Sequence, residues 1–507
     1  MSAGGHIGAQ GVPLNRGMIT LTVMVASILQ ALDNTIANVA LPHMQGSLSA
    51  TQDQMTWVLT SYIVAAAIMT PLTGWLADRF GRKPLFLVSI IGFTCASALC
   101  GMAQSLEQIV LFRLLQGLCG AALIPMSQAV LFDAYPPQQH GRAMAIWGVG
   151  VVLGPMLGPM LGGWLTDDYS WRWVFYINVP FGILAVLGVM AYFPDTTHAR
   201  KSFDFFGFAL LSIAVGTLQL LLDRGPLKDW FNSSEIRLET AIAALAFYLF
   251  VVHTLTAKRP FIRLALYKDR NFLTGNILIF VVGIVLFATL ALLPPLLQGL
   301  MNYSVFQAGL TMVPRGAGTL LAMLFVGRLV GRIDVRLIIG VGLALTAFSL
   351  WQMTRLSMQF NMAAIVWPGA IQGMGIGIVY VPMAALTFAT LAPAMRNEGT
   401  ALFNLVRNIG SSIGISTVQG LMVRNTQVVH ASLAQHLTPL TLAHHSLGVG
   451  NQALAALNRA VTAQASMIAY LDDFQLMLIL TLLALPLLLL VRNTRSAGAD
   501  VKHAAIE

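Results

Sequence analysis

Long apolar stretches constrain this chain more than any other feature of its sequence. A helix of about 20 apolar residues crosses the hydrocarbon core of a bilayer. Only 10% of the 507 residues are charged, whereas a soluble protein carries about 25%. The sequence therefore predicts an all-α polytopic membrane protein and excludes a water-soluble enzyme. Charged, Pro-rich and Gly-rich breaks divide it into fourteen expected transmembrane helices, at about 18–38, 57–77, 85–103, 107–130, 142–165, 173–193, 205–222, 238–256, 272–296, 304–326, 337–354, 363–390, 400–423 and 470–491.

The distribution of Lys and Arg predicts the orientation. With the N-terminus in the cytoplasm, nineteen of the 29 basic residues fall in cytoplasmic segments, seven outside and three within helices. Cytoplasmic loops concentrate Lys and Arg, and an even number of helices returns the chain to its starting side. Both termini are therefore expected in the cytoplasm. The net charge of +9 then reflects topology, so membrane lipids and not nucleic acid are the expected partners.

A weak internal repeat predicts the organisation of the helices. Residues 74–83 (GWLADRFGRK) and 327–336 (GRLVGRIDVR) share a leading Gly, a Leu two positions later and an Arg five positions later. A sequence motif repeated in two helical halves is typical of a transporter built from related bundles. We therefore expect an N-terminal six-helix bundle in 1–198, an inserted helix pair in 199–262, and a C-terminal six-helix bundle in 263–507 that includes an outer loop at 424–469.

Few ionisable residues lie well inside the expected helices, away from their ends. We single out Asp33, Arg113, Arg315 and Arg407. At a rise of 1.5 Å per residue, Asp33 and Arg113 lie at a similar depth in the outer third of the membrane, so an ion pair between them is expected. A charge at this depth is costly unless it is paired or faces a wet cavity. The pair is therefore either a proton-coupling site or a static link between two helices.

Other polar residues predict a substrate cavity. Asn34 and Asn38 extend the polar stretch around Asp33, and Asn404 accompanies Arg407. Arg315 follows Pro314, so it either contacts substrate or donates to backbone carbonyls that the proline frees. Arg407 either lines the cavity or extends toward the inner face. The candidate cavity residues are Asn34, Asn38, Gln116, Arg315, Asn404 and Arg407.

The fifth expected helix has an unusual glycine face. Glycines recur four residues apart at 150, 154, 158 and 162, and Pro155 and Pro159 lie between them. Small residues let another helix approach closely, and prolines remove backbone donors. The helix is either statically packed or a dry, bendable element between the two halves. Its candidate residues are Gly154, Pro155, Gly158, Pro159, Gly162 and Gly163.

Metal and enzyme chemistry is not expected. The adjacent His444 and His445 in the 424–469 loop could hold a metal, but a solvated, partly helical loop explains them as well. The three cysteines lie in apolar stretches and are interpreted as packing residues. No metal-ligand cluster, nucleophile–base pair or phosphate loop stands out at a membrane face, so neither a metal nor a cofactor is expected and a membrane-embedded enzyme or sensor is disfavoured.

Several of these motifs, in this order, resemble those of the major facilitator superfamily. The likeness covers nearly the whole chain and is strongest to the fourteen-helix drug:proton antiporters of the EmrB/QacA type. The residues that carry it are 32–42 in the first helix, 74–83 in the loop between the second and third, 113–117 in the fourth, 154–163 in the fifth, 171–180, and 407–410.

This resemblance implies a proton-coupled exporter of hydrophobic or amphiphilic compounds that works by alternating access. The alternative is a narrow-specificity exporter of a metabolite, fatty acid or siderophore on the same scaffold. The proton gradient would supply the energy without a cofactor. By resemblance, Arg113 takes part in proton transfer, and the 74–83 loop is a gate latch formed by Gly74, Asp78, Arg79, Gly81, Arg82 and Lys83. Gly331 replaces the acidic residue in the second copy, so the latch is expected to be asymmetric.

The resemblance also implies a bacterial inner-membrane location. Members of this subfamily in double-membrane bacteria often work with a periplasmic adaptor and an outer-membrane channel. The 424–469 loop is a candidate docking segment for such partners.

Overall fold

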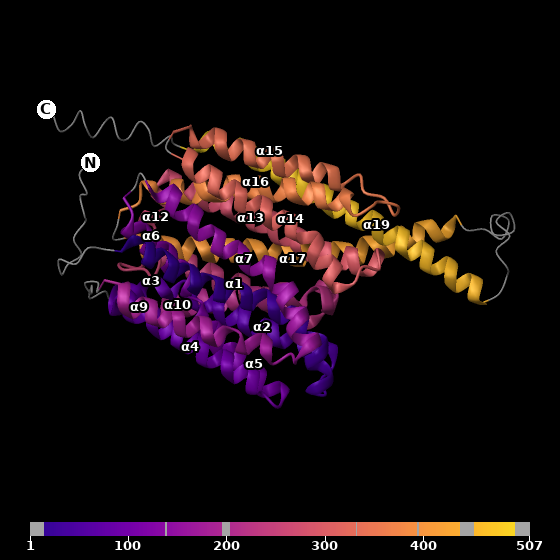
Figure 1. Ribbon diagram of the computed structural model, residues 1–507, viewed down its shortest axis with the longest axis horizontal. Coiled ribbons are helices and arrows are strands. Elements are labelled where there is room, and N and C mark those ends of the chain that lie inside the picture. The colour runs from indigo at the N-terminus through magenta and orange to yellow at the C-terminus, as the bar shows by residue number, and fades with distance from the viewer. Residues whose placement is uncertain are drawn as a thin grey trace.

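The computed structural model describes residues 15–136, 139–194, 203–330, 332–392, 395–436 and 451–491. Within these ranges the chain is helical and contains no β-strand, which confirms the predicted fold class. Figure 1 shows long helices lying side by side along one direction, with short connections at both ends. Gly331, His444 and His445 lie outside the described residues, so the predictions made for them stay predictions.

The first half of the described chain contains α1 to α9. Their bounds are α1 Arg16–Ser47, α2 Gln52–Met69, α3 Leu72–Phe80, α4 Arg82–Met102, α5 Leu106–Gly120, α6 Leu123–Ala134, α7 His140–Asp168, α8 Trp173–Tyr176 and α9 Asn178–Tyr192.

The remaining helices complete the bundle. Their bounds are α10 Phe205–Arg224, α11 Ser234–Thr256, α12 Ala265–Lys268, α13 Arg270–Pro295, α14 Val305–Leu329, α15 Val335–Met353, α16 Ala363–Ala389, α17 Arg396–Gln435 and α19 Asn451–Ala484. Short 3-10 or π turns follow at Pro226–Lys228, Trp230–Asn232, Leu296–Leu300 and Leu485–Leu490.

Most expected spans correspond to helices that can cross a membrane. Twelve helices in the described residues are long and apolar enough, and a thirteenth is the bent pair of α2 and α3. That pair corresponds to the span expected at 57–77 and is bent by 56° between its two segments. Pro71 lies at the break and lacks the N–H group that would continue the helix. The remaining expected span, 400–423, falls in α17, which is more polar than the others.

The two ends of the bundle can be told apart by their contacts. At one end, the Tyr135 hydroxyl at the end of α6 lies 2.9 Å from Thr20 Oγ1 at the start of α1. At the same end, Arg336 at the start of α15 donates to the carbonyl of Val491, the last residue that the structure describes. We call this the termini end and its opposite the hairpin end.

The hairpin end carries a helical projection in the segment that was expected to be an outer, partly helical loop. α17 continues to Gln435 and α19 begins at Asn451, so much of the 424–469 segment is helix. The segment is rich in Ala, Leu and Gln, which favour helix. His430 Nε2 lies 3.0 Å from Asn458 Oδ1 and joins the two arms. Figure 1 shows the ends of α17 and α19 extending beyond the other helices at the right.

The inserted pair, α10 and α11, packs on helices from both halves of the chain. Asp223 near the end of α10 accepts a hydrogen bond from Thr60 of α2. One turn earlier in α10, Gln219 accepts a hydrogen bond of 2.9 Å from Ser412 of α17. α10 therefore lies against α2 and α17 together and touches the two halves at once.

Candidate functional site

Asp33 forms the centre of a fully buried polar network in the first half of the chain. Its Oδ2 lies 2.6 Å from Arg113 Nη1 of α5, which confirms that the two residues meet. Its Oδ1 accepts hydrogen bonds of 2.9 Å from Gln116 Nε2 and from Asn178 Nδ2. Asp33 is 0% exposed and Arg113 is 1% exposed. All three partners donate, so the network fits an ionised carboxylate, which can only accept.

The Arg113 side chain is held from several sides. Its Nε donates to the Val58 carbonyl at 3.1 Å, and its Nη1 also donates to Gln116 Oε1 at 2.8 Å. The guanidinium lies 4.3 Å from the ring centroid of Tyr62. A buried ion pair offsets its desolvation only when its remaining donors and acceptors are satisfied. These contacts satisfy most of them.

The network contains residues that the sequence reasoning did not assign to it. Gln116 was expected in the substrate cavity, but the structure places it, fully buried, between Asp33 and Arg113. Asn178 and its neighbour Ser97, which are 3.0 Å apart, were missed. A signal existed for Asn178, because it is an amide at the start of an apolar stretch within a recognised motif. Ser97 gave no comparable signal.

Asn34 and Asn38 differ from the buried network. Both side chains are exposed, and they lie one helical turn apart on the same face of α1. At this depth, an amide side chain that faces lipid costs free energy, because lipid cannot form hydrogen bonds with it, whereas one that faces water does not. These two residues therefore mark a face of α1 that suits a hydrated path.

The glycine face of α7 packs on α1 beside Asp33. A methyl group added to Gly154 would lie 2.6 Å from Ala31 Cβ and 2.7 Å from the Leu32 backbone nitrogen. Gly158 faces Thr35 and Gly162 faces Ile36 in the same way. Gly163 meets nothing within 4 Å. The close approach of these two helices positions the segment of α1 that holds the carboxylate.

A different face of α7 meets the second half of the chain. Gly141 packs on Val330, Gly148 on Met323, and Met156 on Gly316, all in or beside α14. The expectation that this helix lies between the halves is thus met by the α7–α14 contact. The regular glycine face at 150–162 packs within the first half. α7 is one continuous helix that contains Pro155 and Pro159.

Polar residues close the termini end between the two halves. Asp78 Oδ1 accepts a 2.6 Å hydrogen bond from Asn397 Nδ2 at the start of α17. Asp133 of α6 pairs with Arg82 and also with Arg396 Nη1, the latter at 2.9 Å. Two latch residues, Asp78 and Arg82, thus contact other helices at this end. Their partners Asn397 and Asp133, and Arg396 beside them, were not identified from sequence.

Close backbone approach reinforces this contact. A methyl group added to Gly74 would lie 3.0 Å from Glu398 Cα. Gly81 has φ of 88°, a left-handed conformation that favours glycine and joins α3 to α4. Arg79 Cζ lies 5.4 Å from the Trp75 ring centroid. Lys83, at the start of α4, completes the predicted latch residues at this end.

The polar residues predicted in the second half are largely buried. Arg315 is 5% exposed, and its Nη2 donates to the Leu286 carbonyl of α13 at 3.2 Å. Pro314 does not free that carbonyl, which corrects the predicted alternative. Asn404 is 1% exposed and donates to Gln128 Oε1 of α6 at 2.7 Å. Arg407 is half-buried and donates to the Tyr380 hydroxyl at 3.3 Å.

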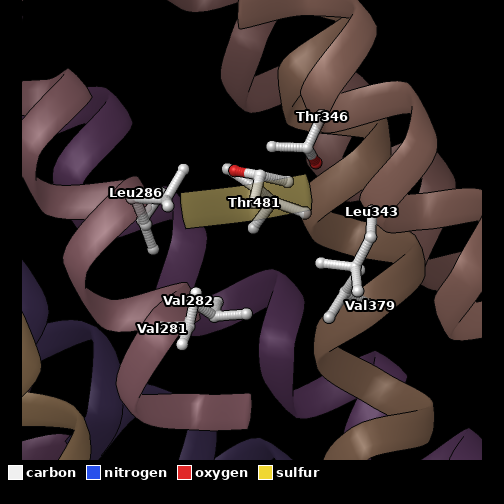
Figure 2. A pocket seen from close by; sticks show the side chains of 9 residues that line it. Val281, Val282, Leu286, Leu343, Thr346, Val379 and Thr481 are labelled. Atoms are coloured by element: carbon white, nitrogen blue, oxygen red, sulfur yellow. The ribbon is translucent and has the colours of Figure 1, made fainter. Parts of the chain in front are cut away.

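Figure 2 shows a void among α13, α15, α16 and α19, with Leu286, Leu343, Thr346 and Thr481 around it. Its volume is about 10 Å³. A water molecule needs at least about 10–15 Å³ measured in this way. The void is therefore a packing defect that holds at most one water, and no substrate fits there.

Comparison with known proteins identifies the family. The sequence profile of the Major Facilitator Superfamily matches residues 23–415. The chain belongs to this superfamily. It is 36% identical over 425 residues to the multidrug export protein EmrB of Escherichia coli strain K12, covering 83% of each chain. It is 35% identical over 490 residues to the fatty acid resistance protein FarB of Neisseria gonorrhoeae, covering 95% of this chain and 97% of that one.

Solved structures agree on the fold. The human organic anion transporter MFSD10 superposes with a TM-score of 0.60 at 15% identity, covering 92% of this chain and 99% of that one. The proton:xylose symporter XylE gives a TM-score of 0.59 at 13% identity, covering 92% and 94%. This major facilitator protein is therefore a membrane transporter.

Proposed function

We propose that this transporter is a proton-coupled exporter of hydrophobic or amphiphilic compounds that works by alternating access. Relatives that share about a third of its residues are named for multidrug export and for fatty acid resistance, which supports outward transport of such compounds. The second name also suits the narrower alternative, an exporter of a metabolite, fatty acid or siderophore. The proposed location is the bacterial inner membrane, and the Lys and Arg distribution supports a cytoplasmic termini end.

The observation that carries the proposal is the set of donors around Asp33. Three side chains donate to its two oxygens, and the carboxylate is fully buried. A proton on either oxygen would turn one acceptor into a donor that faces an N–H group. Protonation therefore favours a rearranged network, in which α1, α5 and α9 hold different positions. This supplies the link between proton binding and helix movement that an antiporter requires.

The contacts at the termini end support a proposal for which side of the transporter is closed in this state. Asp78–Asn397, Asp133–Arg396 and the Gly74–Glu398 approach join the two halves there. In the proposed orientation this state is closed to the cytoplasm while Asp33 is ionised. A proton that arrives from outside would disrupt the network, and the change would release the contacts at the termini end. The exchanged compound then leaves on the reverse movement.

The proton gradient is the proposed energy source, with no cofactor. The α17–α19 hairpin, which would project outside, is the proposed contact for a periplasmic adaptor and an outer-membrane channel. Deletion of residues 430–455 should abolish co-purification with such an adaptor. Unchanged co-purification would show that the hairpin is not the dock.

The test of coupling uses purified protein in liposomes with an acidic interior. A panel of lipophilic cations, phenolic uncouplers and fatty acids is added outside, and proton efflux is followed with a trapped pH dye. We expect efflux that at least one compound triggers and that is lost in Asp33→Asn. Asp167→Asn is the matched control, since its carboxyl is exposed on the same half of the chain. Transport without proton movement would refute the coupling.

A further inference from the structure

Arg315 is a buried cation without a carboxylate partner. Its side chain lies at the middle of α14, is 5% exposed, and makes one hydrogen bond, from Nη2 to the Leu286 carbonyl. Its Nη1 is buried and has no hydrogen-bond partner within the described part of the chain. Among the described residues, no Asp or Glu lies within salt-bridge distance of it. A guanidinium does not release its proton in a protein, so the charge stays.

The contrast with Arg113 shows that this is unusual. Both arginines lie deep in the membrane-spanning part, but Arg113 is neutralised by Asp33 at 2.6 Å. An unpaired buried charge is costly in a membrane. Arg407 repeats the pattern in the same half. It donates to the neutral Tyr380 and Asn408, and its buried Nε lacks a partner. Among the described residues, Arg315 and Arg407 are therefore two cations of the second half that no carboxylate pairs with.

Other unsatisfied polar atoms accompany Arg315. Gln372 of α16 is 0% exposed; its Nε2 donates to Thr289 Oγ1 at 3.2 Å and its Oε1 has no partner. Thr289 lies one turn beyond Leu286 on α13, and Gln372 adjoins Gly373, which packs on the Arg315 backbone. Arg315 of α14 and Gln372 of α16 therefore bond to neighbouring turns of α13.

The position of Arg315 connects it to the contact between the two halves. The next residue, Gly316, packs on Met156 of α7, between the two prolines of that helix. Arg315 is therefore adjacent in sequence to a residue at the contact between the two halves, and its guanidinium is covered in this state.

We propose that Arg315 binds the anionic head of the exported compound, which is an amphiphilic monoanion whose apolar body occupies the space between the halves. The proposal rests on the proposed export function and assigns its substrate class. An oxygen of the anion accepts from Nη1, which removes the uncompensated charge. An amphiphilic cation would be repelled at the same place. The charges thus favour an acid with an alkyl or aromatic body over a quaternary amine.

The test measures binding, so it does not depend on transport. The full-length protein is placed in phosphatidylcholine nanodiscs, and ligand retention is measured by equilibrium dialysis with empty nanodiscs subtracted. The probes are decanesulfonate, decyltrimethylammonium and decanol, which share one chain length and differ in head charge. The variants are Arg315→Gln and Arg315→Lys. The control is Arg355→Gln, whose side chain lies over the Trp351 ring outside the buried region.

We expect wild type to bind decanesulfonate at least tenfold more tightly than decanol or decyltrimethylammonium. Arg315→Gln should lose this tenfold preference, Arg315→Lys should retain most of it, and Arg355→Gln should leave it unchanged. Equal affinity for decanesulfonate and decanol in wild type would overturn the proposal, and this arm needs no variant to fold. Retained preference in a folded Arg315→Gln would overturn it as well.

The binding result is separable from the proposed export function. If decanesulfonate binding depends on Arg315 but no compound moves protons in the liposome test, the anion site stands and the export proposal fails. If compounds trigger proton efflux that Asp33→Asn abolishes, while wild type shows no preference for the anion, the exporter stands and the substrate class is wrong.

Discussion

The close packing of α7 on α1 yields a prediction about Gly154. A methyl group there would lie 2.6 Å from Ala31 Cβ and 2.7 Å from the Ala31 carbonyl carbon and the Leu32 nitrogen. Carbon atoms in contact prefer about 3.5–4.0 Å, so α1 must retreat by roughly 1 Å. Two of the three nearest atoms are backbone, which no side-chain rotation can relieve. Overpacking of this kind costs about 1–3 kcal/mol.

The retreat would reach the carboxylate, because Asp33 follows Leu32 directly. Its Oδ2 lies 2.6 Å from Arg113 Nη1, and a shift of about 1 Å lengthens that contact beyond hydrogen-bond range. Gly154→Ala should therefore lower both the thermal stability of the purified protein and substrate-triggered proton efflux. The matched control is Gly163→Ala, where a methyl group meets nothing within 4 Å. That change should stabilise the helix by up to about 1 kcal/mol.

The assay pairs thermal unfolding in detergent with the liposome efflux measurement on both variants. We expect Gly154→Ala to be about 1–3 kcal/mol less stable than Gly163→Ala and to transport poorly. If Gly154→Ala matches Gly163→Ala in both measurements, α1 does not depend on this approach. The argument that α7 positions Asp33 would then be refuted.

Two further predictions concern the termini end. Asp78→Ala removes the acceptor for Asn397 and should raise labelling of a cysteine introduced at Gln128 from that end; unchanged labelling would count against the latch. Asp204 is partly buried, which alone raises a carboxyl pKa, but hydrogen bonds from the Gly207 amide, His253 and the Phe261 amide lower its pKa. A lowered pKa stabilises the fold above the unfolded value of about 3.9 and loses effect as pH falls through the folded value. Asp204→Asn should thus cost about 2 kcal/mol at pH 7 and much less at pH 3 in thermal unfolding, and an equal loss at both would contradict this.

The meeting of Asp33 and Arg113 could be predicted because it depends on depth alone. The rise per residue gives each residue a height in the membrane, and two opposite charges at one height have strong reason to pair. Ser97 and Asn178 complete the network through the lateral arrangement of α4 and α9. Height carries no information about that arrangement, so these residues could not be placed.

The residues that pair across the termini end could not be predicted from sequence, for a related reason. Asn397 lies 319 residues from Asp78, and Arg396 lies 263 residues from Asp133. Sequence order brings neither pair together; only the docking of the two halves does. The segment of the α17–α19 hairpin was expected to be a partly helical loop, and the length of its helices was not predicted, because hydropathy detects helices that face lipid. A polar helix that extends beyond the membrane gives no such signal, although its Ala, Leu and Gln content favours helix.

The buried charges of the two halves have different proposed roles in transport. In the first half, three side chains donate to Asp33, and the proposed function has this network rearrange when a proton arrives. In the second half, Arg315 keeps its charge and lacks a counterion among the described residues. Inward movement of a proton and outward movement of a monoanion each carry positive charge inward. The proposed exchange would thus draw on the membrane potential, worth about 2.3 kcal/mol per charge at 100 mV, in both of its steps. Exchange of a proton for a monovalent cation would gain nothing from it, so a dependence of export on membrane potential separates the two substrate classes.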